Sequence, residues 1–114
     1  MNIVCLEISQ VNANFAGIKP HLLRAIDKSR GLYNLPHVSQ LILEAKMQVW
    51  VLYNDEHNIK GVGCTEILHR PERTVCSISL LAGGHIEDWD EQFPVLEDFA
   101  RHNKCDYIEF QGRP

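Results

Sequence analysis

The sequence predicts one mixed α/β (α+β) domain built around a sheet, and three observations predict it. The chain has 114 residues, 45% of them hydrophobic, which is enough apolar material for one core. Runs of β-branched and apolar residues alternate with segments whose apolar residues recur every three or four positions. Only turn-sized polar stretches separate these segments. We therefore predict a single domain over residues 1–114 with the element order β-α-α-β-β-β-α-β.

The amino-terminal part predicts one strand and two helices. Residues 3–8 are β-branched and apolar, which is typical of a strand, and the polar residues 9–12 break it. Apolar residues then recur at helical spacing from Lys19-Pro20, with Pro20 suited to a first helical turn and Gly31 to the stop. A second periodic run begins at Leu35-Pro36 and ends near Lys46.

The middle of the chain predicts a three-strand antiparallel meander. Residues 48–53 are β-branched and aromatic, and residues 54–58 are typical of a turn. A second strand is expected from residues 59–69, a second turn at 70–73, and a third strand at 74–81. The short turns make antiparallel neighbours of these strands.

The carboxy-terminal part predicts a helix and a last strand. Gly83 and Gly84 end the meander, and apolar residues then follow helical spacing to about Asn103. Pro94 lacks an amide hydrogen, so it either kinks this helix or marks a start near Phe93. Residues 105–111 alternate in polarity, which indicates a half-buried strand.

Composition argues against several classes of function. The net charge is -4 and the basic residues are scattered, so we expect no nucleic-acid partner. No apolar run approaches the roughly 20 residues that span a bilayer, and the amino terminus does not resemble a signal peptide. We expect a cytoplasmic protein without a membrane partner.

The cysteines predict buried thiols. All four lie in apolar, strand-like stretches and form no CxxC pair, and the six histidines are well separated, so we expect no metal site. A nucleophilic role for Cys64 or Cys76, with His69 or His85 as base, is the alternative to a packing role. The four cysteines are Cys5, Cys64, Cys76 and Cys105.

Several passages, read in this order, resemble the GNAT N-acetyltransferases: residues 48–53, 61–66, 81–84, 96–101 and 105–113. The resemblance covers nearly the whole chain and matches the first two-thirds of that fold. It implies a central mixed, mostly antiparallel sheet. The same passages are similar to a GNAT-like subgroup common among bacteriophage and prophage proteins.

The resemblance also implies acetyl-CoA as cofactor. In the family, acyl-CoA enters where the fourth and fifth strands splay, and its pyrophosphate binds backbone amides at the start of the third helix, an ordinary anion site. The matching residues of this chain are Leu80, Leu81, Gly83, Gly84 and His85.

The cofactor loop departs from the family in two ways. The family sequence Gln/Arg-x-x-Gly-x-Gly/Ala is absent, since only Gly83-Gly84 is present. Four acidic residues crowd the helix start, where they satisfy the helix dipole and repel a pyrophosphate. They are Glu87, Asp88, Asp90 and Glu91.

Glu66 is the candidate catalytic base. GNAT enzymes often place a carboxylate on a central strand for this purpose, and alternation puts Glu66 on the same face as Val62 and Cys64. The alternative is a strand-end carboxylate in solvent or in a salt bridge.

Two functions follow from the resemblance. The first is an N-acetyltransferase, phage-encoded, with weak or absent acetyl-CoA-dependent activity. The second is a non-catalytic phage virion, assembly or accessory protein that uses the fold for protein contacts, in the virion or the host cytoplasm. The family fold usually continues with a helix and two strands where this sequence stops at Pro114, so we expect residues 105–111 to offer an edge for a protein partner or self-association.

Overall fold

The computed structural model describes residues 1–111 and contains nine helices and strands in that range. The order is β-α-α-α-β-β-β-α-β, which differs from the predicted order by one short helix. The elements are β1 (Asn2–Leu6), α1 (Ile8–Ala13), α2 (Phe15–Lys28), α3 (Leu35–Leu43), β2 (Met47–Tyr53), β3 (Ile59–His69), β4 (Thr74–Gly83), α4 (Ile86–His102) and β5 (Tyr107–Phe110).

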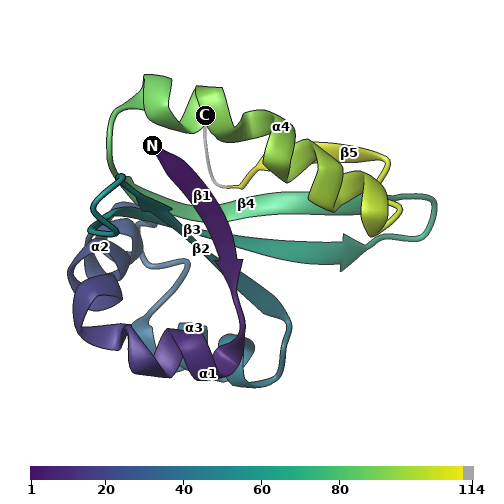
Figure 1. Ribbon diagram of the computed structural model, residues 1–114. Helices are drawn as coiled ribbons and strands as arrows, with labels where there is room; N and C mark the ends of the chain where they lie inside the picture. Colours follow the sequence, from purple (N-terminus) through teal and green to yellow (C-terminus); the bar gives the residue numbers. More distant parts are fainter. Residues whose placement is uncertain (112–114) are drawn as a thin grey trace.

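The five strands form one sheet in the order β1-β2-β3-β4-β5 (Figure 1). The first four strands pair antiparallel, and β5 pairs parallel to β4. The predicted mixed, mostly antiparallel sheet is therefore confirmed. The parallel pair requires a crossover, and α4 provides it.

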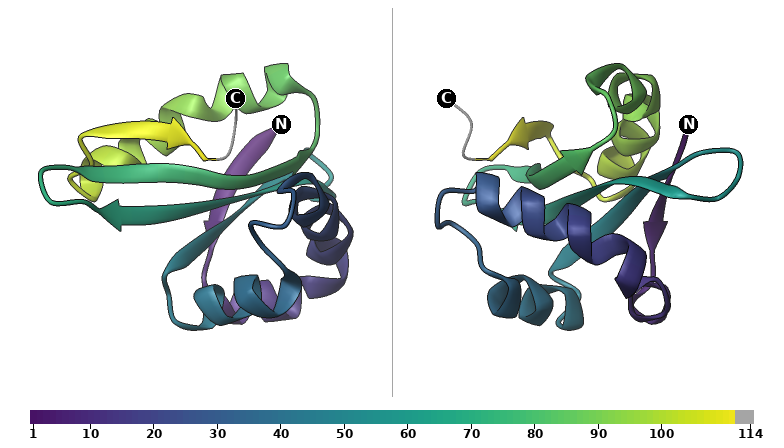
Figure 2. Two further views of the ribbon diagram at one scale, coloured as in Figure 1. Left: turned by 180° about the vertical axis from the view of Figure 1, so that it is seen from behind. Right: turned by 90° about the vertical axis from the view of Figure 1, so that its left-hand side faces the viewer.

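The helices cover the sheet from both sides, with α1, α2 and α3 on one face and α4 on the other (Figure 2). Each face has its own core. On one face, Ile18 and Leu22 of α2 and Val38 of α3 pack against residues of the central strands. Under α4, Trp50 packs edge-on against Phe99 with ring centroids 5.0 Å apart. The sheet is thus the middle of three layers.

The first two helices correct the sequence interpretation. Residues 9–12, expected to be a break, lie in α1, where the Gln10 side chain accepts a hydrogen bond from the Glu7 amide at 2.9 Å. Helix α2 begins at Phe15, so Pro20 lies inside it and not in its first turn. Burial of Ile18 and Leu22 against the sheet explains why the helix continues through a residue of low intrinsic propensity.

Pro94 also lies inside a helix, because α4 is one element from Ile86 to His102. The proline removes the donor for the Asp90 carbonyl. Both residues are on the exposed side of α4, where water can satisfy that carbonyl. The helix ends with Asn103 as its C-cap, where the periodicity placed it.

All four cysteines are free thiols. Cys64 and Cys76 are fully buried, whereas Cys5 and Cys105 are half-buried. Burial raises the pKa of the Cys64 thiol to about 12 and that of Cys76 to about 11, so both stay protonated at neutral pH and pack as small apolar groups.

Two features are absent from residues 1–111. No helix there has the length and hydropathy of a membrane span. In the same range no group of three or more His, Cys, Asp or Glu side chains is placed to hold a metal ion.

Candidate active site

Strands β4 and β5 pair over four residues in the part of the chain that the structure describes. Their ladder runs from Val75 opposite Tyr107 to Ile78 opposite Phe110. The Gln111 amide then donates to the Ile78 carbonyl at 3.0 Å. Beyond this point residues 80–83 pair with β3 alone, within the part of the chain that the structure describes. None of residues 1–111 pairs with the second side of this last part of β4, which we call the free edge of β4.

A β-bulge marks the point of separation. Cys64 and Thr65 are neighbours in β3, but their partners in β4 are Leu80 and Ile78. Ser79 is thus an extra residue in β4. A bulge bends its strand and increases the local twist, which turns β4 away from the line of β5.

A polar cluster lies at the bulge on the face covered by α2. The Oε2 atom of Glu66 accepts from the Ser79 hydroxyl at 2.8 Å and lies 2.9 Å from the Tyr33 hydroxyl, which can donate to it. The Oε1 atom of Gln111 lies 2.9 Å from the Tyr33 hydroxyl and also accepts from Ser77 and Ser79, at 3.2 and 3.1 Å. Two hydroxyls, those of Tyr33 and Ser79, thus connect Glu66 to the end of β5.

The cluster sets the protonation of Tyr33. Burial raises the pKa of the phenol, the Ser79 hydrogen bond lowers it in part, and the adjacent Glu66 carboxylate raises it further. Tyr33 is therefore a hydroxyl donor at neutral pH. The Oε1 atom of Glu66 has no hydrogen-bond partner among residues 1–111, so this oxygen can accept a proton.

A groove of about 370 Å³ runs along the free edge of β4 on the α2 face. Ser79, Leu80 and Leu81 form one wall, and the end of α2 with Lys28 and Arg30 forms the other. Glu66 and Tyr33 do not line the groove, because Ser79 and Gln111 stand between them and the open space. Ser79 therefore connects the groove to the carboxylate.

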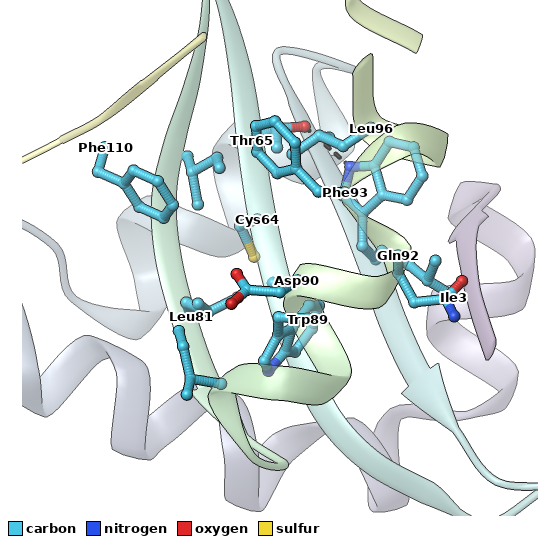
Figure 3. A pocket seen from close by; sticks show the side chains of 14 residues that line it. Ile3, Cys64, Thr65, Leu81, Trp89, Asp90, Gln92, Phe93, Leu96 and Phe110 are labelled. Atoms are coloured by element: carbon cyan, nitrogen blue, oxygen red, sulfur yellow. Dashed lines mark hydrogen bonds between the residues drawn. The ribbon is translucent and has the colours of Figure 1, made fainter. Parts of the chain in front are cut away.

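The α4 face of the same gap is nearly filled. Its pocket is about 50 Å³ and almost entirely apolar, and Trp89, Phe93 and Leu96 occupy most of the space between α4 and the sheet (Figure 3). Asp90 is the one charged residue that lines it. The cavities on the two faces meet at shared lining residues, Ile78, Leu81 and Phe110.

The start of α4 is occupied by contacts within the protein. The Trp89 indole donates to the Gly83 carbonyl at 2.8 Å, and the His85 amide donates to the Asp88 carboxylate at 3.2 Å. Gly83 has φ 84°, and a Cβ there would come within 2.5 Å of the Lys60 carbonyl oxygen. The turn and its packing thus require this glycine.

The residues at this helix start do not fit a pyrophosphate. The His85 amide is taken by Asp88, the side chains of Glu87 and Asp90 add negative charge, and no Lys or Arg lies between Arg73 and Arg101. The free edge of β4 differs from this helix start, because a groove with Lys28 and Arg30 on its other wall runs beside it.

The predicted site residues therefore lie in three places. Leu80 and Leu81 line the groove, Gly83, Gly84 and His85 form the turn into α4, and Glu66 lies behind Ser79. Sequence reasoning missed Tyr33, Ser79 and Gln111, which are brought to Glu66 from a loop, a bulge and the end of β5. Their separation from Glu66 along the chain left no local pattern to find.

No protein-family model matches the sequence, and no curated protein matches it. Solved structures do match: the chain has the fold of the GNAT acetyltransferases.

Three of these structures illustrate the likeness. A probable acetyltransferase superposes with a TM-score of 0.70 at 11% identity, covering 97% of this chain and 79% of that one. A ribosomal-protein-alanine N-acetyltransferase from Brucella melitensis biovar Abortus 2308 gives 0.66 at 14% identity, over 100% and 81%. An aminoglycoside N-acetyltransferase in complex with CoA gives 0.62 at 8% identity, over 98% and 79%. At these identities the likeness concerns the fold.

Proposed function

We propose that this protein transfers an acyl group from an acyl-thioester donor such as acetyl-CoA to an amine, with weak activity compared with enzymes that have a complete pyrophosphate loop. One observation carries the proposal: the Tyr33–Glu66–Ser79 cluster lies where β4 separates from β5 and a groove opens. A carboxylate next to a free strand edge suits a reaction that needs a base beside an extended ligand.

Glu66 removes the proton of the attacking amine in this proposal. Ser79 lines the groove and donates to Glu66, so its hydroxyl can pass its own proton to the carboxylate while it takes one from the amine. Tyr33 donates to the same carboxylate oxygen and positions it. The donor, when bound, supplies an activated acyl group, and Leu80, Leu81, Gly83, Gly84 and His85 remain its proposed contacts.

The test is acyl transfer by the wild-type protein, measured as release of the CoA thiol with a panel of primary amines. Glu66→Gln keeps the shape and removes the base, so we expect the rate to fall about 100-fold or more while acetyl-CoA binding by calorimetry is unchanged. Glu72→Gln, in the exposed β3–β4 turn, is the matched control and should keep the wild-type rate. Equal rates for the two variants contradict the role of Glu66.

A non-catalytic assembly role is the second candidate, and the position of β5 favours it. β5 is the last strand of the sheet, and Phe110 at its end is 52% exposed. We propose that this edge pairs with a protein partner or a second copy of the chain. The phage origin, with a place in the virion or the host cytoplasm, is part of this candidate and rests on the resemblance of the sequence passages.

Light scattering coupled to size exclusion separates the candidates. A monomer that releases CoA supports the first, and a stable oligomer that releases none supports the second. Phe110→Glu puts a charge at the end of the edge strand and should dissociate such an oligomer. An oligomer unchanged by Phe110→Glu excludes the β5 edge as its interface.

A further inference from the structure

Helix α2 and the turn that follows it carry a row of basic side chains, which we call the basic row: His21, Arg24, Lys28 and Arg30. The first three follow the spacing i, i+3, i+7 and so lie on one side of the helix. Arg30 follows two residues after the helix ends. His21, Arg24 and Lys28 therefore form one line along α2, and Arg30 follows in the turn after it.

The basic row runs beside the free edge of β4. At one end, the Nδ1 atom of His21 lies 2.7 Å from the position that a Cβ on Gly83 would occupy. At the other end, Lys28 and Arg30 line the groove together with Ser79. The sequence showed no Lys or Arg near the cofactor loop, and the fold brings Lys28 and Arg30 to the groove beside Leu80 and Leu81.

The basic row is available to a ligand. The ion pairs of residues 1–111 are Lys46–Glu44, Arg70–Glu109 and Arg101–Asp98, none of which involves the row. Arg24 contacts the ring of its neighbour His21. Asp27 is the one acidic residue that lines the groove, against the two cations Lys28 and Arg30.

The groove therefore has the positively charged side chains that the start of α4 lacks. Its cations are exposed and can turn toward a ligand, and the Ser79 and Gln111 side chains add polar groups along the wall. Phosphate groups bind most strongly through charge-assisted hydrogen bonds from Arg and Lys.

We infer that the groove between α2 and the free edge of β4 binds the phosphate groups of an extended ligand, with Lys28 and Arg30, which line the groove, as their contacts and Arg24 adding positive charge beside them. If the proposed function holds, these are the phosphates of the acyl donor, held on the α2 side of the sheet and not at the start of α4. The inference rests on the proposed function only for the identity of that ligand.

Calorimetry with two probes, inorganic pyrophosphate and acetyl-CoA, tests the inference on the full chain. Lys28→Gln should weaken binding of both about tenfold, and Arg24→Gln/Lys28→Gln more. Lys19→Gln is the matched control, because it removes the same charge from an exposed position on the opposite side of α2. Thermal unfolding of each variant confirms that it is folded.

The outcomes separate this inference from the proposed function. Loss of pyrophosphate binding in Lys28→Gln but not in Lys19→Gln supports the inference, even if no acyl transfer is found. Pyrophosphate binding that the Lys28→Gln and Lys19→Gln variants keep or lose equally overturns it and leaves the proposed function intact. No binding of either probe to the wild type at millimolar concentration overturns it as well.

Discussion

Helices α2 and α4 both flank strand β4, from opposite faces of the sheet, and their charges are opposite. Helix α2 contains three Lys or Arg and one Asp, whereas α4 contains one Arg and six Asp or Glu. The start of α4 is fixed by contacts within the protein, and the basic row of α2 makes almost none. The end of β4 where a pyrophosphate is expected therefore holds the start of α4 in place, whereas the cations lie on the face of the sheet that α2 covers.

The largest effect should come from removing the anchor of α4. Trp89 packs on β3 where Gly61 and Gly63 leave room, and it donates to the Gly83 carbonyl. Trp89→Ala should lower the free energy of unfolding by about 3 kcal/mol, measured by urea denaturation. Trp89→Phe, which mainly loses the hydrogen bond, should cost about 1 kcal/mol. A stable Trp89→Ala variant would show that the start of α4 is not fixed in this way.

The acidic residues at the start of α4 should contribute less to the free energy of unfolding than Trp89 does, and their contributions should differ from one another. Asp88 accepts from the His85 amide and lies near the positive end of the helix dipole, so Asp88→Ala should cost about 1 kcal/mol. Glu91 is exposed and lies beyond the first turn, so Glu91→Ala should cost a few tenths of a kcal/mol at most. Equal urea midpoints for the two variants would argue against a capping role for Asp88.

The basic row should matter even less to stability. Lys28 makes no ion pair among residues 1–111 and gains only from the negative end of the α2 dipole. Lys28→Gln should change the free energy of unfolding by less than about 0.5 kcal/mol. A larger loss would mean that Lys28 has a structural role, and the contrast between the two helices would weaken.

The smallest effect concerns pH. Burial lowers the pKa of His21, and the Arg24 guanidinium lowers it further. The unfolded chain therefore takes up a proton more readily, so His21 should reduce stability as the pH falls below about 6.5. His21→Gln should flatten the fall in urea midpoint between pH 7 and pH 5. An unchanged slope would mean that His21 titrates alike in both states.

The strands were predictable, since their β-branched runs are short, local and separated by turn residues. Strand β3 lies at residues 59–69 as predicted, and β4 is two residues longer than expected. Helix α1 was missed because residues 9–12 have little apolar character. Its Glu7–Gln10 pair, a reciprocal cap three residues apart, was the available signal.

The site was predictable only in part. Glu66 was singled out because it stands on a central strand, and it shares a cluster with Tyr33 and Ser79 on the α2 side; its role as a base stays a prediction. The bulge at Ser79 interrupts the alternation of side chains in β4, and the amino-acid composition of that strand does not reveal it. A ligand-binding role for the basic row could not be predicted either, because it depends on which strand α2 packs against, and the sequence does not show that.

The extra residue in β4 also decides which way the following side chains face. Before the bulge, Cys76 and Ile78 belong to the core under α4, and with regular alternation Leu80 and Ala82 would join them. Both belong instead to the core under α2 and α3. Deleting Ser79 would make the β3–β4 ladder regular and leave Leu80 and Ala82 in the core under α2 and α3, so it should remove the bulge and the hydroxyl that contacts Glu66 without turning β4 over.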